Sequence, residues 1–336
     1  AMPYLMEGRH ASPEQALKAG LVHELAPPAE LIARARRWLL ETPTAVQPWD
    51  EKGFRFPGGN ALDPRVAPAF VVSNTMLQAS TQQNLPAPQA IQSCLYEGSL
   101  LPLEKALRVE TKYLMTVACG PVSRGMIRTL FVSKGKAEKG LHRPAGLPPL
   151  QSRKLGMIGA GMMGGGIALV AAQRGIEVVL IDRDQAAAER GRAYAEKALG
   201  KQVERGRMAA DERDAILARI RPTADYELLR DADMVVEAVF EDRAVKAEVT
   251  RRPDAVLPED CVFATNTSAL PITLLAQATT RPGRFIGLHF FSPADKMPLV
   301  EVIRGKATSD ATLARALDFV GQLKKTPIVV NDARGF

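Results

Sequence analysis

From Lys154 onward, short apolar runs alternate with longer segments that have helical spacing. The apolar runs predict strands at residues 155–159, 177–181, 234–239, 261–264, 285–290, 299–303 and 327–330. The segments between them predict helices at residues 162–174, 185–205, 244–255 and 310–324. Strands that alternate with helices are typical of an α/β domain whose mostly parallel sheet is covered on both faces. We therefore expect a doubly wound α/β domain over residues 154–336.

The pattern before this domain is different. Ser12-Pro13-Glu14-Gln15 combines a capping residue, a proline at the first helical position and a glutamine three residues after the cap, which predicts a helix start. Apolar spacing predicts further helices at residues 31–41 and 103–118. Between residues 42 and 88, proline, glycine and asparagine interrupt the pattern, and we expect an irregular segment. The sequence thus predicts a helical piece over 1–45, then an irregular segment and linker helix over 46–153.

Composition narrows the class of protein. The chain has 336 residues, 46% hydrophobic and 24% charged, which suits about two folded domains. Its three cysteines have no CxxC spacing, which excludes a disulfide framework and a cysteine-rich zinc module and favours the reducing cytoplasm. Much of the net charge of +7 comes from residues 134–154, where six basic residues stand against Glu138 among glycines and prolines. We interpret this stretch as a solvated linker. With 5% aromatic residues in the chain, we expect no nucleic-acid surface.

One uncharged stretch imitates a membrane helix. Residues 155–172 are long enough to be a candidate span, but six of these 18 residues are glycines. A strand, a glycine turn and a helix start explain the stretch better. The N-terminus also lacks the pattern of a signal peptide, so we expect no membrane span.

The strongest motif is Gly159-Ala160-Gly161-Met162-Met163-Gly164, between a predicted strand and a predicted helix. Gly159 permits a tight turn, Gly161 lets a pyrophosphate approach the backbone, and Gly164 lets helix and strand pack closely. The next strand ends in Asp182, whose carboxylate suits the ribose hydroxyls of NAD and would repel a 2′-phosphate. The motif therefore predicts a Rossmann-type NAD site, and the neighbouring Arg183 leaves NADP open.

Two carboxylates stand in the predicted strand 234–239 and just after it. In a doubly wound sheet, ligands collect at the carboxyl ends of strands, so Glu241 is a better site residue than Glu237. Lys246 could bind a phosphate or pair with Glu241.

A histidine and a glutamate occupy two other apolar strands. A lone histidine such as His289 is more often a core residue than a catalyst, and an unpaired Glu301 would be costly to bury. A His289–Glu301 pair would resolve both anomalies, because the carboxylate orients the ring and raises its basicity. Ser268, which follows the strand 261–264, could present its hydroxyl to a substrate oxygen, or residues 266–268 could form a helix cap before Pro271.

Five motifs in this order resemble the NAD-binding domain of L-3-hydroxyacyl-CoA dehydrogenases: residues 159–167, 235–241, 266–268, 287–293 and 299–303. The resemblance implies that His289 is the catalytic base, Glu301 its partner, and Ser268 a contact of substrate and cofactor. It also implies that NAD contacts Met163, Asp182, Val239, Phe240, Glu241 and Lys246. The family commonly has asparagine near the nicotinamide at the position of Ser292, so a shorter side chain would make this contact.

The first half also resembles part of a known fold. Residues 8–22 resemble the end of the enoyl-CoA hydratase (crotonase) fold, and residues 103–132 lead from it into the dehydrogenase. This order resembles multifunctional fatty-acid oxidation enzymes, such as the α subunit of the bacterial complex. The hydratase glutamates of that family lie upstream of the residues present, and residues 334–336 resemble the start of its helical C-terminal domain. We therefore expect a fragment that binds NAD with little or no turnover.

The resemblance implies that the parent protein oxidises L-3-hydroxyacyl-CoA to 3-ketoacyl-CoA in fatty-acid β-oxidation and also has hydratase activity. Its substrate would be an acyl-CoA, and a thiolase β subunit would be a possible partner. Two alternatives stay open. The chain could be a non-catalytic nucleotide-binding or scaffold module that docks to a thiolase, or a dehydrogenase of the same fold that acts on another hydroxy acid.

Overall fold

The computed structural model describes residues 2–42, 46–56 and 58–336. Parts of the predicted irregular segment, residues 43–45 and 57, lie outside the described residues. Contacts within the chain divide it into two units, Ala1–Phe131 and Val132–Phe336, which we describe separately.

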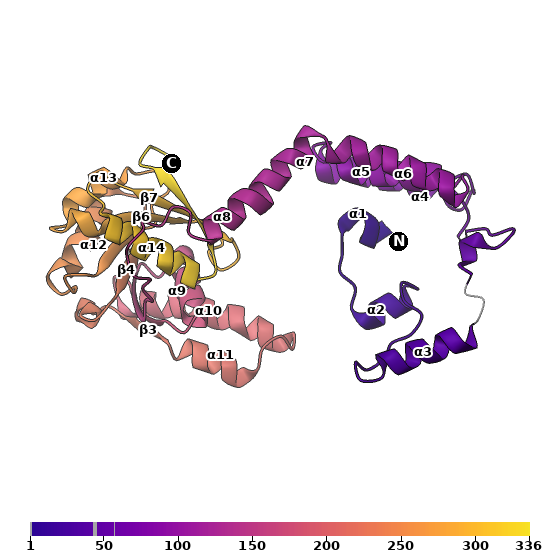
Figure 1. Ribbon diagram of the computed structural model, residues 1–336. Coiled ribbons are helices and arrows are strands. Elements are labelled where there is room, and N and C mark those ends of the chain that lie inside the picture. Colours follow the sequence, from indigo (N-terminus) through magenta and orange to yellow (C-terminus); the bar gives the residue numbers. More distant parts are fainter. Residues whose placement is uncertain (1, 43–45, 57) are drawn as a thin grey trace. The chain divides into compact units, whose positions relative to one another are not determined.

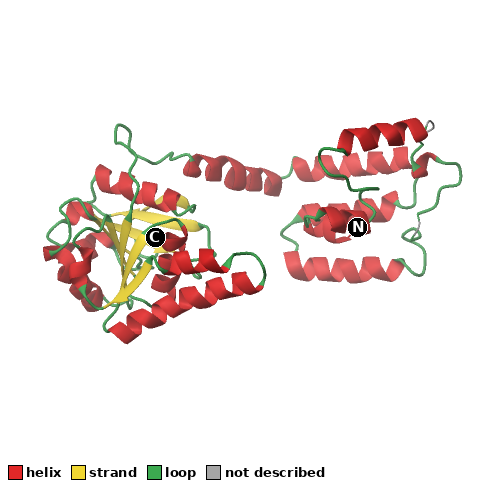
Figure 2. Cartoon of the chain, turned by 90° about the horizontal axis from the view of Figure 1, so that it is seen from below, coloured by secondary structure: helices red, strands yellow, loops and turns green. Residues whose placement is uncertain are grey.

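The described residues of the first unit form helices and loops without a strand (Figure 2). The helices are α1 (Met2–Glu7), α2 (Pro13–Lys18), α3 (Leu31–Glu41), the 3-10 turn η1 (Pro48–Asp50), α4 (Ala67–Thr81), α5 (Pro86–Gly98), α6 (Leu103–Ala118) and α7 (Pro121–Met126). The predicted start of α2 is confirmed, because the Ser12 hydroxyl accepts a hydrogen bond from the Gln15 amide and the Gln15 side chain accepts one from the Ser12 amide.

The expectation of an irregular segment over residues 42–88 is wrong, because α4 and the start of α5 lie within it. The prolines that we took as helix breakers mark helix starts. Pro68 and Pro86 occupy the first turns of α4 and α5, where a missing amide hydrogen costs little. The two helices contact each other: the Gln92 side chain donates a hydrogen bond to the Phe70 carbonyl at 2.8 Å.

The second unit is built on an eight-stranded sheet with the order β3-β2-β1-β4-β5-β6-β7-β8 (Figure 1). The strands are β1 (Lys154–Ile158), β2 (Glu177–Ile181), β3 (Ile220–Thr223), β4 (Met234–Glu237), β5 (Val262–Thr265), β6 (Phe285–Phe290), β7 (Leu299–Arg304) and β8 (Thr326–Asn331). β1 to β6 run parallel, β7 pairs antiparallel with β6, and β8 is parallel to β7. The doubly wound, mostly parallel α/β fold is confirmed. The pattern missed the short strand β3, where Arg221 and Pro222 interrupt the apolar run.

Helices cover both faces of the sheet. They are α9 (Met162–Gln173), α10 (Gln185–Glu204), α11 (Ala210–Leu217), α12 (Arg243–Arg251), α13 (Ile272–Leu275) and α14 (Asp310–Gln322), with shorter turns η3 (Tyr226–Leu229), η4 (Arg252–Ala255), η5 (Ala276–Ala278) and η6 (Pro282–Arg284). α9, α10, α11 and α14 share one buried apolar cluster with alternate strand residues. α12 and α13 share the other cluster with the opposite strand face. Burial on both faces explains why the strands read as nearly continuous apolar runs.

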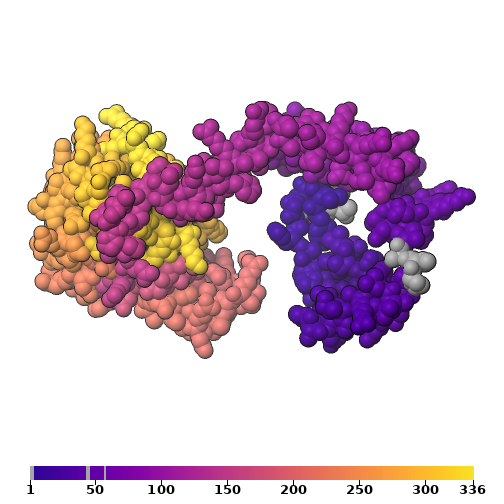
Figure 3. Space-filling view, in the orientation of Figure 1, coloured from indigo at the N-terminus to yellow at the C-terminus, as the bar shows by residue number. Residues whose placement is uncertain are grey.

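Residues 132–153 belong to this second unit. They complete the π-helical segment η2 (Ile127–Ser133) and form α8 (Lys134–Glu138). α8 contacts β8, where the Thr326 hydroxyl donates a hydrogen bond to the Glu138 carboxylate at 3.0 Å. Arg143 donates to the Asp318 carboxylate of α14 at 2.7 and 2.9 Å. In Figure 3 this magenta segment lies on the yellow residues near the C-terminus. The interpretation of this stretch as a solvated linker is wrong for Arg143, whose side chain is 20% exposed.

Among the described residues, the structure has no helix that is both long enough and apolar enough to cross a membrane. The uncharged stretch 155–172 instead forms β1, the glycine turn and most of α9.

Candidate cofactor and catalytic site

The glycine turn connects β1 to α9 at the carboxyl edge of the parallel strands. Gly159 has φ +95°, and a Cβ there would lie 2.7 Å from the Ala238 carbonyl oxygen. A Cβ on Gly164 would lie 1.7 Å from the Gly159 carbonyl oxygen, so this glycine sets the close approach of α9 to β1. Gly161 is the N-cap of α9, and a Cβ built on it would meet nothing within 4 Å. The turn therefore leaves open space where helix amides can face an anion.

Asp182 lies directly after β2, beside this turn. One carboxylate oxygen accepts a hydrogen bond from the Ala160 amide at 2.7 Å, which fixes the side chain against the glycine motif. The neighbouring cavity has a volume of about 470 Å³ and is lined by Ala160, Gly161, Met162, Asp182, Arg183, Ala187, Arg190 and Tyr194. A carboxylate, an aromatic ring and open backbone in one cavity fit the adenosine half of NAD.

The sequence reasoning missed Arg190 and Tyr194. Both lie on α10, whose approach to the turn depends on Gly191: a Cβ there would lie 2.6 Å from the Ala160 Cβ. Helical spacing places Arg190 and Tyr194 one turn apart on the same face, but nothing in the sequence indicates that this face meets the glycine turn. Of the two methionines in the glycine motif, Met162 lines the cavity, whereas Met163 packs against the apolar core.

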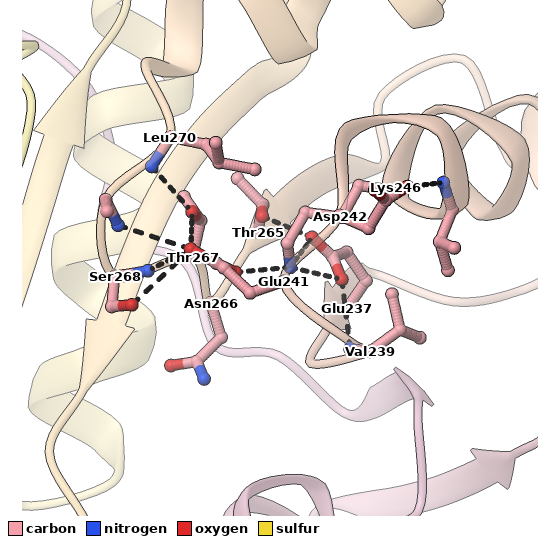
Figure 4. Close-up of polar contacts among 12 residues, drawn as sticks. Glu237, Val239, Glu241, Asp242, Lys246, Thr265, Asn266, Thr267, Ser268 and Leu270 are labelled. Carbon is pink, nitrogen blue, oxygen red and sulfur yellow. Dashed lines mark hydrogen bonds and ion pairs between the residues drawn. The ribbon is translucent and has the colours of Figure 1, made fainter.

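A second group of candidate residues gathers after β4 and β5 (Figure 4). Val239 and Phe240 follow β4; Val239 is half-buried and Phe240 is 80% exposed. Lys246 of α12 is 1% exposed, and its ammonium lies 2.9 Å from the Glu237 carboxylate and 3.3 Å from that of Glu241. The sequence predicted that Lys246 could pair with Glu241. It did not predict the pair with Glu237, because this carboxylate lies inside an apolar strand and no partner for it is evident from the sequence.

Glu241 holds the loop that follows β5. One of its carboxylate oxygens accepts hydrogen bonds from the Thr267 hydroxyl at 2.5 Å, the Ser268 amide at 2.9 Å and the Ala269 amide at 3.2 Å. Burial by itself would raise the pKa of Glu241, but these donors and the Lys246 ammonium outweigh burial and lower it. Residues 266–268 do not cap α13, whose first amides bind the Asp332 carboxylate instead.

His289 and Glu301 face each other across the antiparallel pair β6–β7. The Nδ1 atom of His289 lies 2.7 Å from a Glu301 carboxylate oxygen, and both side chains are 18% exposed. The rings of Phe291 and Phe336 flank the imidazole, with centroids 4.7 and 6.0 Å away. The predicted pair is therefore present in the structure. It leaves the other ring nitrogen, Nε2, available for a proton.

Ser268 and Ser292 are exposed, after β5 and β6 respectively. Among the described residues, no hydrogen bond joins Ser268 directly to His289. Asn266 makes the connection between the two strand ends, since its side-chain oxygen accepts a hydrogen bond from the Phe290 amide at 2.8 Å. The glycine turn follows β1, Ser268 follows β5, and His289 is near the end of β6. All three therefore lie toward the carboxyl edge of the sheet, where ligands of such folds bind.

Four features together define the nucleotide-binding domain of a dehydrogenase: the doubly wound fold, the glycine turn, the aspartate after β2 and the histidine–glutamate pair. Residues 154–333 match the family "3-hydroxyacyl-CoA dehydrogenase, NAD binding domain", and the chain belongs to this family. The cofactor of this domain is NAD.

Named relatives agree with this assignment. The chain is 36% identical, over its whole length, to the fatty acid oxidation complex subunit alpha of Shewanella baltica, and the match covers 47% of that protein. The structure is similar to FadB2 of M. tuberculosis (40% identity, TM-score 0.54, 56% of this chain and 66% of that chain). It is also similar to the (S)-3-hydroxybutyryl-CoA dehydrogenase PaaH1 of Ralstonia eutropha (39% identity, TM-score 0.54, 55% of this chain and 66% of that chain). The chain thus spans about half the length of its curated relative.

Proposed function

We propose that the protein to which this chain belongs oxidises the 3-hydroxyl of an L-3-hydroxyacyl-CoA to a ketone and reduces NAD. The observation that carries the proposal is the His289–Glu301 pair, held at 2.7 Å in the NAD-binding domain. The family to which the chain belongs is an NAD-binding domain of 3-hydroxyacyl-CoA dehydrogenases, and the name of the similar (S)-3-hydroxybutyryl-CoA dehydrogenase supports an acyl-CoA substrate. The name of the Shewanella relative supports a place in fatty-acid oxidation.

The pair can act as a general base. Glu301 binds Nδ1 of His289, which directs Nε2 toward the substrate hydroxyl and stabilises the imidazolium that forms when the ring takes the hydroxyl proton. Bound NAD would supply the hydride acceptor for the substrate carbon. Phe291 and Phe336 pack beside the imidazole and cover part of it. We assign Ser268 to the substrate oxygen and Ser292 to the nicotinamide side.

The remaining cofactor contacts follow the resemblance and the positions of the residues. Gly159, Gly161 and Gly164 shape the turn for the pyrophosphate, and Asp182 holds the adenosine ribose. The segment Val239–Phe240–Glu241 after β4, in which Phe240 and Glu241 are exposed, would lie against the nicotinamide half. We assign Lys246 to this side of the site as well, and its burial indicates that it acts through a neighbour.

We also propose that the 336 residues bind NAD but turn over acyl-CoA slowly by themselves, because they cover 47% of the Shewanella relative. The name of that relative supports a protein of fatty-acid oxidation. We further propose a cytoplasmic location, enoyl-CoA hydratase activity in the parent and a thiolase subunit as partner. These assignments follow the resemblance of residues 8–22 and 103–132 to a multifunctional enzyme.

The test uses the full-length protein and follows NADH formation from (S)-3-hydroxybutyryl-CoA by absorbance. The His289→Gln variant should oxidise this substrate about 10²–10⁴-fold more slowly while it binds NAD as before. His142→Gln replaces an exposed histidine of the same unit and should change neither quantity. A wild-type protein without NADH formation, or a fully active His289→Gln variant, would contradict the proposal.

A further inference from the structure

Two buried charges lie beside the site and take no part in the proposed proton transfer to His289. Glu237 is fully buried and Lys246 is 1% exposed. The Glu237 carboxylate contacts the Lys246 ammonium at 2.9 and 3.1 Å and accepts hydrogen bonds from the Val239 amide at 3.1 Å and from the Thr265 hydroxyl. The Glu237 carboxylate therefore has partners just after β4, on β5 and on α12.

The charges are not needed for packing. A buried ion pair loses its hydration on folding, and apolar side chains of similar volume often give equal stability. The Lys246 ammonium also contacts the Glu241 carboxylate at 3.3 Å. The side chain of Glu241 is 36% exposed, so without this contact only its hydrogen bonds to residues 267–269 would hold it in place.

The anchored carboxylate determines the position of the loop after β5. Glu241 accepts hydrogen bonds from Thr267, Ser268 and Ala269, and these include two backbone amides. A continuous chain of contacts thus leads from Glu237 through Lys246 and Glu241 to Ser268 (Figure 4).

We propose that Glu237 and Lys246 are positioning residues, which place Ser268 for the reaction by fixing the Glu241 carboxylate against loop 267–269. The proposal rests on the proposed function for the role of Ser268. The placement of the loop itself can be measured without turnover.

The first test measures amide hydrogen exchange in this chain. A Glu237→Gln/Lys246→Met variant removes both charges together and nearly keeps their volumes, so the fold has no unpaired buried ion. The Ser268 and Ala269 amides should then exchange at least about tenfold faster, because their acceptor is no longer anchored. Glu248→Gln is the matched control: it breaks an exposed ion pair with Arg252 on the same helix and should leave these amides unchanged. Unchanged exchange in the double variant would overturn the proposal.

A second variant covers the case in which the double variant does not fold. Thr265→Val keeps the shape of the side chain and removes the hydroxyl that orients Glu237. It should accelerate exchange of the same two amides by about twofold to fivefold. Exchange at the wild-type rate in this variant would also overturn the proposal.

The second test measures activity in the full-length enzyme. Misplacement of Ser268 in the double variant should lower kcat/KM for (S)-3-hydroxybutyryl-CoA by about tenfold to a hundredfold, and the loss should appear in kcat. The same two substitutions should have little further effect on a Ser268→Ala background, because they act through that residue. Additive losses would indicate a general structural role and overturn the proposal. A weaker Kd for NAD with kcat unchanged would make Lys246 a cofactor ligand and overturn it as well.

The two proposals fail differently. A wild-type enzyme that oxidises no 3-hydroxyacyl-CoA would refute the proposed function, and the exchange rates would then decide the placement of the loop alone. An active enzyme whose His289→Gln variant is inactive, with additive effects at Glu237, Lys246 and Ser268, would refute only the positioning role.

Discussion

Replacing Gly161 with alanine separates cofactor binding from folding. The backbone at this position has φ −69°, which alanine adopts freely, and a Cβ would meet nothing within 4 Å. Alanine is a poorer N-cap than glycine by about 0.5–1 kcal/mol, but it lowers the entropy of the unfolded chain, which is worth about 0.4–1 kcal/mol in the opposite direction. The free energy of unfolding should therefore change by less than about 1 kcal/mol, or about 2–4 °C in Tm.

NAD binding should respond strongly, because the new methyl group occupies the space where the pyrophosphate meets the turn. We expect the Kd for NAD to rise at least tenfold, or by about 1.4 kcal/mol. Thermal melts with and without NAD measure both quantities. NAD at a hundred times its Kd stabilises a protein by about 2.7 kcal/mol, which is about 5–10 °C for a unit of this size, and a tenfold rise in Kd should remove about half of that shift.

The matched control is Gly164→Ala. Its Cβ would lie 1.7 Å from the Gly159 carbonyl oxygen, so the backbone must move, and the variant should lose about 1–3 kcal/mol of stability even without NAD. A Gly161→Ala variant that binds NAD within about twofold of wild type would refute the placement of the pyrophosphate at this turn.

Three further outcomes follow from the second unit and its candidate site. Burial raises the pKa of Cys261 to about 12, so its thiol should resist iodoacetamide in the native chain while the exposed Cys119 reacts; mass spectrometry that finds equal labelling would contradict this burial. Arg143→Ala should lower the free energy of unfolding by about 1–3 kcal/mol in urea, because it leaves the Asp318 carboxylate, whose side chain is 12% exposed, without its charged partner, whereas Arg213→Ala at an exposed ion pair should cost less than about 1 kcal/mol. The lowered pKa of Glu241 contributes stability that is present above pH 4.5 and is lost as the pH falls below it; thermal melts should show a smaller acid loss in Glu241→Gln, and identical pH profiles would argue against this role.

The fold of the second unit could be predicted because its apolar pattern and its glycine motif indicate the same strands and helices. Apolar runs such as residues 177–181 are buried on both faces, and the glycine motif requires a strand before it and a helix after it. The failures arose where local signals are ambiguous. Proline both starts and breaks helices, so α4 was read as irregular, and Pro222 concealed β3.

The site could be predicted as far as single residues have conspicuous chemistry. His289 and Glu301 stood out as polar residues in apolar strands, and strand pairing brings them together. Arg190 could not be found, because its place beside Asp182 depends on how closely α10 packs at Gly191. The same limit applies to Glu237, whose partner on α12 is set by the tertiary structure.

Calorimetric titration of this chain with NAD and with NADP, for wild type and Asp182→Ala, tests the assignment of the cofactor site most directly. Asp182 beside the glycine turn predicts that NAD binds, and that NADP binds at least about tenfold more weakly because its 2′-phosphate meets the carboxylate. The Asp182→Ala variant should bind NAD about 10- to 150-fold more weakly, as expected for the loss of charged hydrogen bonds worth about 1.5–3 kcal/mol. Equal affinity for the two nucleotides, or a folded wild-type chain that binds neither, would contradict the assignment.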